Sequence, residues 1–441
     1  MKKLLLSACV IFGIGLSAQT YCTPTSVSGC DVGDNINSFT IPAANFSHLD
    51  SGCSTGAYGD FTFQTINLNA GLNYSYTVTH GYSSQKVRIW IDLNNDGVFT
   101  DSAPELISSA SSVTVAGAYT TDGILQIPAT TAPGSYRMRV GDRYSLDPVP
   151  CDNDGYGEFH DYTVNLGAAP SCLPPNAPVI SGVAPDAAVI TWAASPSTVN
   201  LGYDYYISNS STQPTAATVP TGTVAASALT ANPQSLSPNT QYYVWVRSKC
   251  SAADTSVWSV SSTFTTLCSA FTIPYSENFD TTSVGSYIAS NAPQCWSYLE
   301  TNGSNGVGFV VDYDYNSSSN AYFLSNEDDT SGDVMLVSPK TTSLADGTRR
   351  VRFFAKGYAA GYSLEVGTMT DVADPATFSS ITTIALTDSH AQYIVNIPAG
   401  TNSFLAFKHG LSNTYESIYL DDITIENIPS CLEPFLPVVT A

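Results

Sequence analysis

Basic residues are scarce in this sequence of 441 residues: 15 lysines and arginines stand against 37 aspartates and glutamates, for a formal net charge of −22 at pH 7. An acidic surface repels phosphate backbones and anionic lipid headgroups, which argues against nucleic acid and membrane surfaces as partners. It attracts divalent cations instead. Because 43% of the residues are hydrophobic, the chain is able to bury a core in each of about three domains.

Helical periodicity and catalytic motifs are also missing. No stretch shows the apolar pattern of an amphipathic helix, and none approaches the roughly 20 apolar residues that span a bilayer. The motifs of zinc peptidases, serine hydrolases, phosphate loops and dinucleotide-binding folds do not occur in the sequence. The five histidines are scattered and are expected to be ordinary strand or loop residues (His48, His80, His160, His390 and His409). We therefore expect that this chain is not an enzyme.

What the sequence does contain is many short runs with an alternation of apolar and polar residues, separated by Gly, Asn, Asp and Pro. This alternation is typical of strands in sandwiches and jelly rolls. It predicts an all-β protein made of tandem β-sandwich domains. Proline-bearing seams near 168–175 and 427–434, and a cysteine near 268, indicate the domain boundaries.

The N-terminus starts with Met-Lys-Lys, continues with an apolar run over 4–16 and reaches Ser17-Ala18. This order is typical of a secretory signal peptide, so residues 1–18 are predicted to be one. A lipoprotein signal ending at Cys9 is the alternative, although few apolar residues precede that cysteine. We expect a secreted or cell-surface protein without a membrane span.

Nine cysteines follow the signal peptide, at positions 22, 30, 53, 151, 172, 250, 268, 295 and 431. In an oxidising compartment, cysteines at such spacings predict disulfides rather than metal ligands. Nine is odd, and Cys431 lies in "SCLEPFLPVVTA", which repeats "SCLPPNAPVISG" at 171–182. Residues 430–441 are therefore predicted to start a truncated further module that lacks the partner of Cys431. A free surface thiol is the alternative.

The segment 172–268 contains "AVITW" at 188–192, "LSPNTQYYVWVRSKC" at 236–250 and "VWSVSSTFTT" at 257–266. This order resembles the fibronectin type III domain, with Tyr242 as the corner tyrosine and Val244 and Val246 in the core. The resemblance implies a sandwich but says nearly nothing about function. We suggest that Cys172 and Cys250 pair.

The segment 20–168 contains "KVRIWIDLNNDGVFTD", "GSYRMRVGDRY" and "GYGEFHDYTVNL". Together these motifs resemble the GEVED domain of secreted bacterial proteins. The Gly-Glu-x-x-Asp stretch is matched by Gly157, Glu158 and Asp161, whereas Phe159 and His160 depart from the family's middle residues. The resemblance implies an extracellular module.

The segment 269–428 contains "YSENFD", "CW", "DVMLVSP", "YSLEVGTMTDVADPATFSSI" and "IYLDDITIE" in this order. It resembles the MAM-like and cleaved-adhesin jelly rolls of Bacteroidetes-type surface proteins, and we expect Cys268 and Cys295 to pair. The three resemblances together imply a cargo of type IX secretion. No C-terminal sorting domain is visible, as a truncated chain predicts.

The sharpest local signal is "DLNNDGVFTD" at 92–101. Side-chain oxygens at alternate positions, a glycine and a backbone carbonyl are the ligands with which Ca²⁺ loops begin. The twelfth position is Ala103 instead of the bidentate glutamate of an EF-hand, so Asp101 or Glu105 would complete the shell. The predicted ligands are Asp92, Asn94, Asp96, Val98, Asp101 and Glu105. Alternatively, Asn-Asp-Gly only forms a tight hairpin turn.

Two further acidic groups are candidates. Asp152, Asp154, Glu158 and Asp161 could contribute to an ion site, but they are expected to be solvated loop residues, with Glu158 and Asp161 paired with Arg137, Arg139 or Arg143. In the third segment, the resemblance to adhesin jelly rolls implies a structural Ca²⁺ where the first and last strands meet, held by Glu277, Asp280, Asp421 and Asp422. Regular alternation would put Asp421 with Ile423 and Ile425 on one face and Asp422 with Leu420 on the other, so only one of the two aspartates could face the site.

We expect a non-catalytic adhesin or binding protein with calcium-stabilised β domains, which binds an extracellular protein or polysaccharide. The alternative is a non-catalytic accessory region of an extracellular peptidase or glycoside hydrolase whose catalytic domain lies outside this chain. Exposed tryptophans could stack on sugars. Trp192 is expected in a core, whereas Trp90 and Trp296 stay open.

Overall fold

The computed structural model describes residues 20–25, 28–112, 119–301, 305–328, 330–411 and 413–430. The predicted signal peptide and the region around Cys431 lie outside these residues. Within them the only helical elements are three short 3-10 turns, Pro42–Ala44, Thr55–Ala57 and Pro375–Thr377. The all-β prediction is therefore confirmed. No described helix has the length and apolar character needed to cross a membrane.

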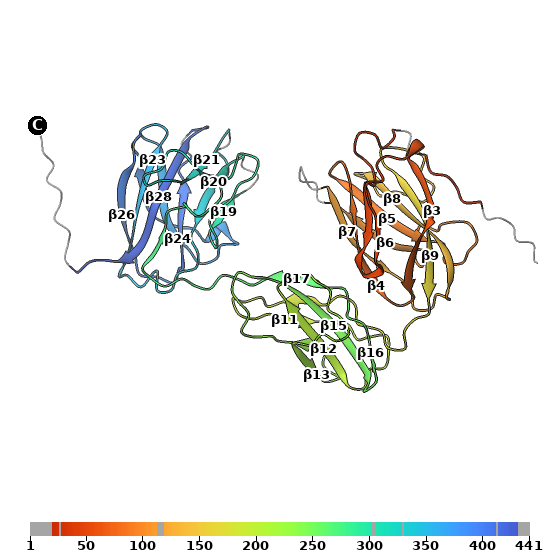
Figure 1. Cartoon of the computed structure of the whole chain (residues 1–441). Coiled ribbons are helices and arrows are strands. Elements are labelled where there is room, and N and C mark those ends of the chain that lie inside the picture. The colour runs from red at the N-terminus through yellow and green to blue at the C-terminus, as the bar shows by residue number, and fades with distance from the viewer. Residues whose placement is uncertain are drawn as a thin grey trace, which may run out of the picture. The chain divides into compact units, whose positions relative to one another are not determined.

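The chain divides into two compact units. The first consists of the described residues up to Val183 with Ala188–Pro233 and Gln241–Phe264, and the second of Ala184–Ala187, Gln234–Thr240 and the described residues from Thr265 on. Within these units the strands form three β-sandwiches, each made of two facing sheets (Figure 1). The expected domain boundaries stay a prediction.

The first sandwich has a four-stranded sheet of order β2-β1-β4-β7 and a five-stranded sheet of order β3-β9-β8-β5-β6. Among the paired strands of this sandwich, β3 and β9 are the farthest apart in the sequence, and they pair in parallel. Side chains such as Ile66, Tyr76 and Val164 fill the core between the sheets. The strands are β1 (Ser38–Ile41), β2 (Phe46–His48), β3 (Tyr58–Asn69), β4 (Asn73–Thr79), β5 (Gln85–Ile91), β6 (Leu106–Ser111), β7 (Thr120–Gln126), β8 (Gly134–Tyr144) and β9 (Phe159–Gly167).

The second sandwich has a three-stranded sheet of order β10-β11-β14 and a sheet of order β13-β12-β15-β16, with β17 also on β15. Trp192, Val244 and Val246 lie in its core, as expected from the sequence. The ring of Tyr242 packs on Phe264. The strands are β10 (Val179–Ser181), β11 (Val189–Thr191), β12 (Gly202–Ser208), β13 (Gly222–Val224), β14 (Thr230–Ala231), β15 (Gln241–Ser251), β16 (Asp254–Thr255) and β17 (Ser262–Thr265).

The third sandwich has one sheet of order β20-β21-β28-β23-β26, with β18 also on β28, and a second sheet of order β19-β22-β27-β24-β25. Residues such as Val310, Leu420 and Phe407 form its main core. The strands are β18 (Tyr275–Glu277), β19 (Ser297–Glu300), β20 (Val307–Val311), β21 (Ala321–Ser325), β22 (Val334–Val337), β23 (Arg349–Gly357), β24 (Ser363–Met369), β25 (Ser379–Ala385), β26 (Ala391–Ile397), β27 (Phe404–His409) and β28 (Ser417–Asn427).

Four disulfides join cysteines of the described residues. The expected pairs Cys172–Cys250 and Cys268–Cys295 are confirmed. The four cysteines of the first sandwich, which the sequence left open, pair as Cys22–Cys151 and Cys30–Cys53. The first of these bonds fixes the start of the described chain to the loop before β9.

Candidate functional site

The acidic segment at 92–101 lies in the loop between β5 and β6 of the first sandwich. These strands pair antiparallel, with Trp90 opposite Leu106, and the backbone N–H of Ile91 donates to the carbonyl of Glu105 at 2.9 Å. The connection therefore runs from Asp92 to Glu105, so the alternative of a tight hairpin turn is wrong. A loop of this length is able to fold around a ligand.

Asp92 is the first residue of this loop and is fully buried. Its carboxylate accepts hydrogen bonds from the backbone N–H groups of Asp96, at 3.2 Å, and Gly97, at 2.9 Å. It also accepts one from the Tyr21 hydroxyl at 2.7 Å. Burial and the neighbouring Asp92 carboxylate raise the pKa of Tyr21, so its hydroxyl keeps its proton. This contact was not predicted from the sequence, because 71 residues separate the two side chains.

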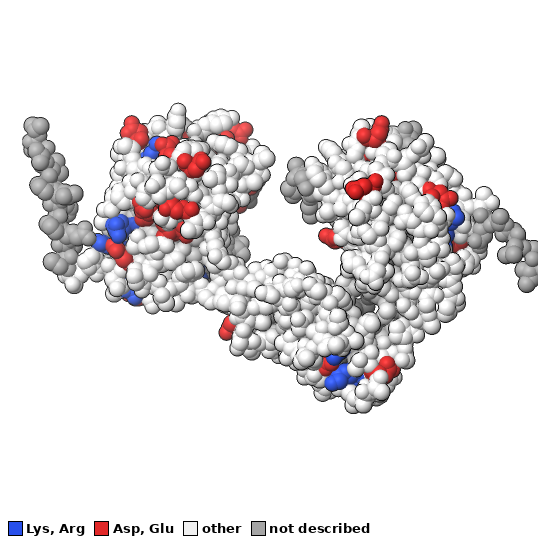
Figure 2. All heavy atoms as spheres, viewed as in Figure 1, with Lys and Arg blue, Asp and Glu red and all other residues white. Residues whose placement is uncertain are grey.

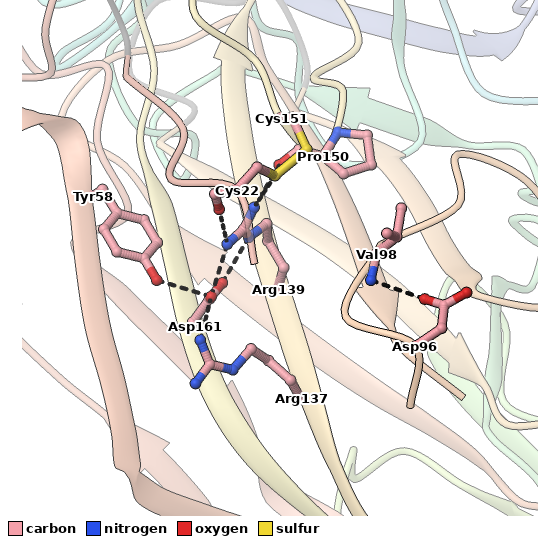
Figure 3. The surroundings of a disulfide bond; sticks show 9 residues. All are labelled: Cys22, Tyr58, Asp96, Val98, Arg137, Arg139, Pro150, Cys151 and Asp161. Carbon is pink, nitrogen blue, oxygen red and sulfur yellow. Dashed lines mark hydrogen bonds and ion pairs between the residues drawn. A yellow bond between two sulfur atoms is a disulfide. The ribbon is translucent and has the colours of Figure 1, made fainter. Parts of the chain in front are cut away.

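Asn94 and Asp96 hold the next turn of the loop. The backbone N–H of Asp96 donates to Asn94 Oδ1 at 2.9 Å, and that of Val98 donates to Asp96 Oδ1 at 2.9 Å, as Figure 3 shows for the second bond. Gly97 has a φ of +87°, in the left-handed region that favours glycine. The alternating polar positions thus fold the backbone back on itself, although the side chains of Asn94 and Asp96 stay exposed to solvent.

The two candidates for the last ligand, Asp101 and Glu105, lie in different surroundings. Asp101 forms an ion pair with Arg88 at 3.0 Å and accepts from Trp90 Nε1 at 3.1 Å. Glu105 is only 2% exposed, and its Oε2 accepts from the backbone N–H of Thr100 at 2.8 Å. A pocket of about 330 Å³ lies beside Glu105 and Asn94. Of the two carboxylates, Glu105 is therefore the more enclosed one, and it lies beside this pocket.

The charge balance of the loop is incomplete. Neither Asp92 nor Glu105 has an ion pair with a Lys, Arg or His side chain of the described chain. A buried carboxylate without a counter-charge is costly, because it loses its hydration. In the part of the chain that the structure covers, no three His, Cys, Asp or Glu side chains are grouped to hold a metal ion. Amide and carbonyl oxygens, which Ca²⁺ also accepts, would have to complete such a site.

The second acidic group has a structural role, as expected. Arg139 and Asp161 are fully buried and form a two-pronged ion pair, with Arg139 Nε at 2.7 Å and Nη2 at 2.8 Å from the carboxylate. Figure 3 shows Arg139 between Asp161 and the Cys22–Cys151 disulfide. Its other hydrogen bonds go to the carbonyls of Cys22, at 2.9 Å, and Pro150, at 2.7 Å. This arginine thus joins β8 and β9 to both ends of the disulfide.

The other members of this group are paired as well. Asp152 contacts Arg143 at 2.8 Å, and Asp154 lies 3.6 Å from the same guanidinium. Glu158 does not pair with arginine. It contacts His160 at 3.0 Å and accepts from the backbone N–H groups of Ile36, at 2.9 Å, and Ser54, at 2.6 Å. These side chains hold loops of the first sandwich to β8 and β9.

The third acidic group meets at the loop 312–320 of the third sandwich. β18 pairs with β28, so the first and last strands of this sandwich are neighbours, as expected. Asp280 accepts from the backbone N–H groups of Ser319 and Asn320, and Asp421 accepts from those of Asn316, at 2.7 Å, and Ser317, at 2.9 Å. Burial, together with the charge of Asp422, raises the pKa of Asp421 to about 6. Glu277 instead accepts from the backbone of Phe279 in its own turn, at 2.8 Å.

The expectation that only one aspartate of the pair could face this site is wrong. Asp422 also contacts the loop, through Asn316 Nδ2 at 2.8 Å and Ser317 Oγ at 2.7 Å. The reason is an irregularity in β28, where two steps on β23 match three steps on β28 and Asp422 has a φ of +49°. Such a bulge changes which face the following residues point to, so Leu420, Ile423 and Ile425 share the core face.

The tryptophans are not available for stacking on sugars. All five have at most 6% of their surface exposed (Trp90, Trp192, Trp245, Trp258 and Trp296). Trp296 donates from Nε1 to the Tyr275 hydroxyl at 2.8 Å, which orients it within the third sandwich. The question left open for Trp90 and Trp296 is thus decided in favour of core positions.

Several solved structures are similar to about a third of this chain. The K2 cleaved adhesin domain of Lys-gingipain is 14% identical over 35% of this chain and 97% of its own length, with a TM-score of 0.29. The K1 domain of Lys-gingipain from Porphyromonas gingivalis W83 is 17% identical over 35% of this chain and 98% of its own length, also with a TM-score of 0.29. TmCBM61, in complex with β-1,4-galactotriose, is 17% identical over 34% of this chain and 94% of its own length, with a TM-score of 0.24.

At these values the structural similarities say nothing about what this chain binds. A search of curated proteins found no match. The family comparison concerns a shorter segment, which contains both the 92–105 loop and the buried pair of Arg139 and Asp161. Residues 86–165 of this chain match the GEVED domain.

Proposed function

We propose that this chain is a secreted or cell-surface binding protein without catalytic activity of its own. The observation that carries the proposal is how its buried charged groups are used. Asp161, Glu158 and Asp421 hold strands and loops through arginine or backbone N–H groups, and four disulfides fix the sandwiches further. This is the chemistry of a rigid scaffold, and rigid sandwiches with functional loops are well suited to binding.

Calcium is the ion that we propose for the 92–105 loop. Asp92, Asn94, Asp96, the Val98 carbonyl and Glu105 would hold it, and it would supply the positive charge that Asp92 and Glu105 lack within the described chain. We leave Asp101 out of the set because it is paired with Arg88. Asp280, Asp421 and Asp422, with Glu277 nearby, are proposed as a second calcium-dependent anchor, at the loop 312–320.

Thermal melting of the purified chain tests the calcium proposal. We expect EDTA to lower the melting temperature and excess CaCl₂ to restore it, because an ion that binds only the folded state stabilises it, by about 4 kcal/mol at 1,000 times its Kd. Asp96→Ala and Glu105→Gln should remove the part of the shift that belongs to the first sandwich. Asp101→Asn is the matched control and should keep it.

Two results would contradict the proposal. A wild-type chain whose melting does not respond to EDTA or CaCl₂ would exclude a stabilising ion. An Asp96→Ala chain that responds as the wild type does would remove the 92–105 loop from consideration. Asp421→Asn, measured in parallel, separates the contribution of the third sandwich.

The binding function is tested with the fluorescently labelled, purified chain on the surface of the producing cells and on their extracellular matrix. We expect saturable binding, and cell fractionation should find the chain outside the cell without residues 1–18. A chain that stays inside the cell, or that shows no saturable binding to either surface, would contradict the proposed function. Export by type IX secretion would be supported by loss of the extracellular chain in a strain that lacks that system.

A further inference from the structure

The third sandwich carries a second apolar layer on the outer face of its larger sheet. Phe309, Phe323 and Tyr419 lie directly opposite one another across β20, β21 and β28. Their neighbours Val310, Leu324 and Leu420 point into the main core, so this aromatic row points to the opposite face. The row belongs to a separate buried cluster of six residues, Val307, Phe309, Val311, Ala321, Phe323 and Tyr419.

Two exposed tyrosines lie on this row. The ring of Tyr287 packs on Phe309 and Phe323, with centroids 5.2 and 5.7 Å apart, and 56% of Tyr287 remains exposed. The ring of Tyr313 lies 6.1 Å from that of Tyr419, and 45% of Tyr313 is exposed. We call Tyr287, Tyr313 and Tyr419, on their base of Phe309 and Phe323, the tyrosine platform.

Fixed polar groups surround the tyrosine platform. Lys356 Nζ lies 2.6 Å from Asp314 Oδ1 and 5.2 Å above the ring of Tyr419. His390 Nε2 donates to the carbonyl of Asp314 at 2.8 Å. Lys356 and Asp314 neutralise each other, but Asp312 lies close enough to Tyr313, and Glu327 to Tyr287, for their carboxylates to interact electrostatically with these phenols. The platform thus has aromatic rings and hydrogen-bonding groups in surroundings of net negative charge.

We propose that the tyrosine platform binds an uncharged polysaccharide. A sugar ring has an apolar C–H face and a rim of hydroxyl groups. The exposed rings of Tyr287 and Tyr313 are able to stack on the apolar C–H face. The phenol hydroxyls, together with Lys356 and Asp314, are able to form hydrogen bonds with the sugar hydroxyl groups. This inference rests on the proposed binding function and names its ligand class and site.

The charge of the molecule supports an uncharged ligand over an anionic one. With a net charge of −22, the chain repels anionic polysaccharides over distances of about 10 Å at moderate salt. Figure 2 shows more acidic than basic groups on the visible face, with wide uncharged areas between them. The buried row beneath the tyrosines also keeps their rings in place, which lowers the entropy lost on binding.

Affinity electrophoresis of the full chain tests the inference. The gels contain glucomannan, galactan, xyloglucan or β-glucan as neutral probes, or alginate as the anionic probe. We expect at least one neutral polysaccharide to retard the chain. Tyr287→Ala and Tyr313→Ala should each weaken that association about fivefold or more, as expected for the loss of one aromatic contact. Tyr287→Phe retains the ring and should retain most of the affinity.

A matched control comes from the first sandwich, where Tyr82 is 49% exposed and its ring lies 5.9 Å from that of Tyr144. Tyr82→Ala should leave retardation unchanged. The inference is overturned if no neutral polysaccharide retards the chain, if alginate retards it more strongly, or if the Tyr287→Ala/Tyr313→Ala chain is retarded as the wild type is. Unchanged melting temperatures will show that the variants are folded.

Binding of the same chains to the cell and matrix surfaces separates this inference from the proposed function. If the wild type and the double variant bind these surfaces equally, the tyrosine platform is not the site, although the binding function stands. If the wild type binds neither the surfaces nor the polysaccharides, both fail.

Discussion

At the scale of single residues, Arg139 is a charged side chain whose burial in the first sandwich depends on several partners at once. It is fully buried, and its guanidinium is shared between Asp161 and two carbonyl groups beside the Cys22–Cys151 disulfide. No pattern of neighbouring residues in the sequence marks it. Removing one partner of a buried ion pair leaves the other charged without hydration, which costs more than the pair itself contributes.

We therefore expect Arg139→Met to lower the free energy of unfolding by about 3–5 kcal/mol. Urea denaturation of the purified chain measures this. Arg88→Met is the control, because its pairs with Asp101 and Asp147 are partly exposed and should contribute about 1 kcal/mol or less. Equal losses for the two variants would show that Arg139 has no special structural role.

Tyr76 gives a prediction for alkaline pH. Burial raises its pKa to about 12, against about 10 in an unfolded chain, and its hydroxyl lies 3.0 Å from Ser108 Oγ. The folded state thus favours the neutral phenol. The contribution of Tyr76 to the free energy of unfolding is complete below pH 10 and is lost as the pH rises towards 12.

In Tyr76→Phe, the loss of stability between pH 10 and 12 should be smaller by up to about 2.7 kcal/mol. Denaturation in urea at a series of pH values measures this. Tyr82→Phe, at an exposed position, should follow the wild type. A Tyr76→Phe chain with the wild-type slope would contradict the prediction.

At the scale of elements, the bulge in β28 sets which side chains of that strand are buried. Leu420 and Ile423 both point into the core although three positions separate them, because the extra residue lies between them. Deleting Asp422 would restore a regular alternation in which Leu420, Ile423 and Ile425 still share a face. Deleting Thr424 would turn Ile425 outward and Glu426 inward.

We accordingly expect the chain without Asp422 to fold, with only the loss of its contacts to the loop 312–320. The chain without Thr424 should lose the cooperative unfolding of the third sandwich, because it would bury a carboxylate in place of an isoleucine. Circular dichroism during thermal melting distinguishes the two. If both deletions are tolerated equally, register does not control this strand.

At the scale of the whole molecule, the seam near 168–175 contributes to the packing of the first sandwich. A boundary at 168 leaves out Leu173, yet this side chain is packed in the core of the first sandwich. The neighbouring Cys172 is joined to Cys250 of the second sandwich. The seam near 168–175 therefore belongs to the packing of the molecule and is not a free linker.

A fragment of residues 20–175 with Cys172→Ser should be more stable than a fragment of residues 20–168 by about 1.5–3 kcal/mol, the value of one buried leucine. Differential scanning calorimetry of both fragments measures this. Leu173→Ala in the longer fragment should reduce it to the stability of the shorter one. Fragments that melt alike would place the boundary at 168 after all.

Much of this architecture could be predicted because its signals are local. Alternation over a few residues predicts strands whatever lies elsewhere in the chain, and the pattern around Val244 and Val246 identified a core strand. The pair Cys172–Cys250 was predicted because it joins the first strand of an expected module to the end of a later one, and Cys268–Cys295 because it joins a linker to the first sheet of the next module. The arginine partner of Asp161 was predicted because the domain has few cations, whereas the pairing of the buried Asp152 with Arg143 was not expected.

The sequence by itself determined the all-β class, the acidic charge and the oxygen-rich loop after β5. Only the tertiary structure decided which groups are buried and which face one another. The contacts of Tyr21 with Asp92, of Asp422 with Asn316 and of Tyr287 with Phe323 join residues that are 71, 106 and 36 positions apart, and the second also depends on an irregular strand. The physical reason is that alternation fixes the face of a side chain relative to its own strand, whereas burial and charge balance depend on which strands meet.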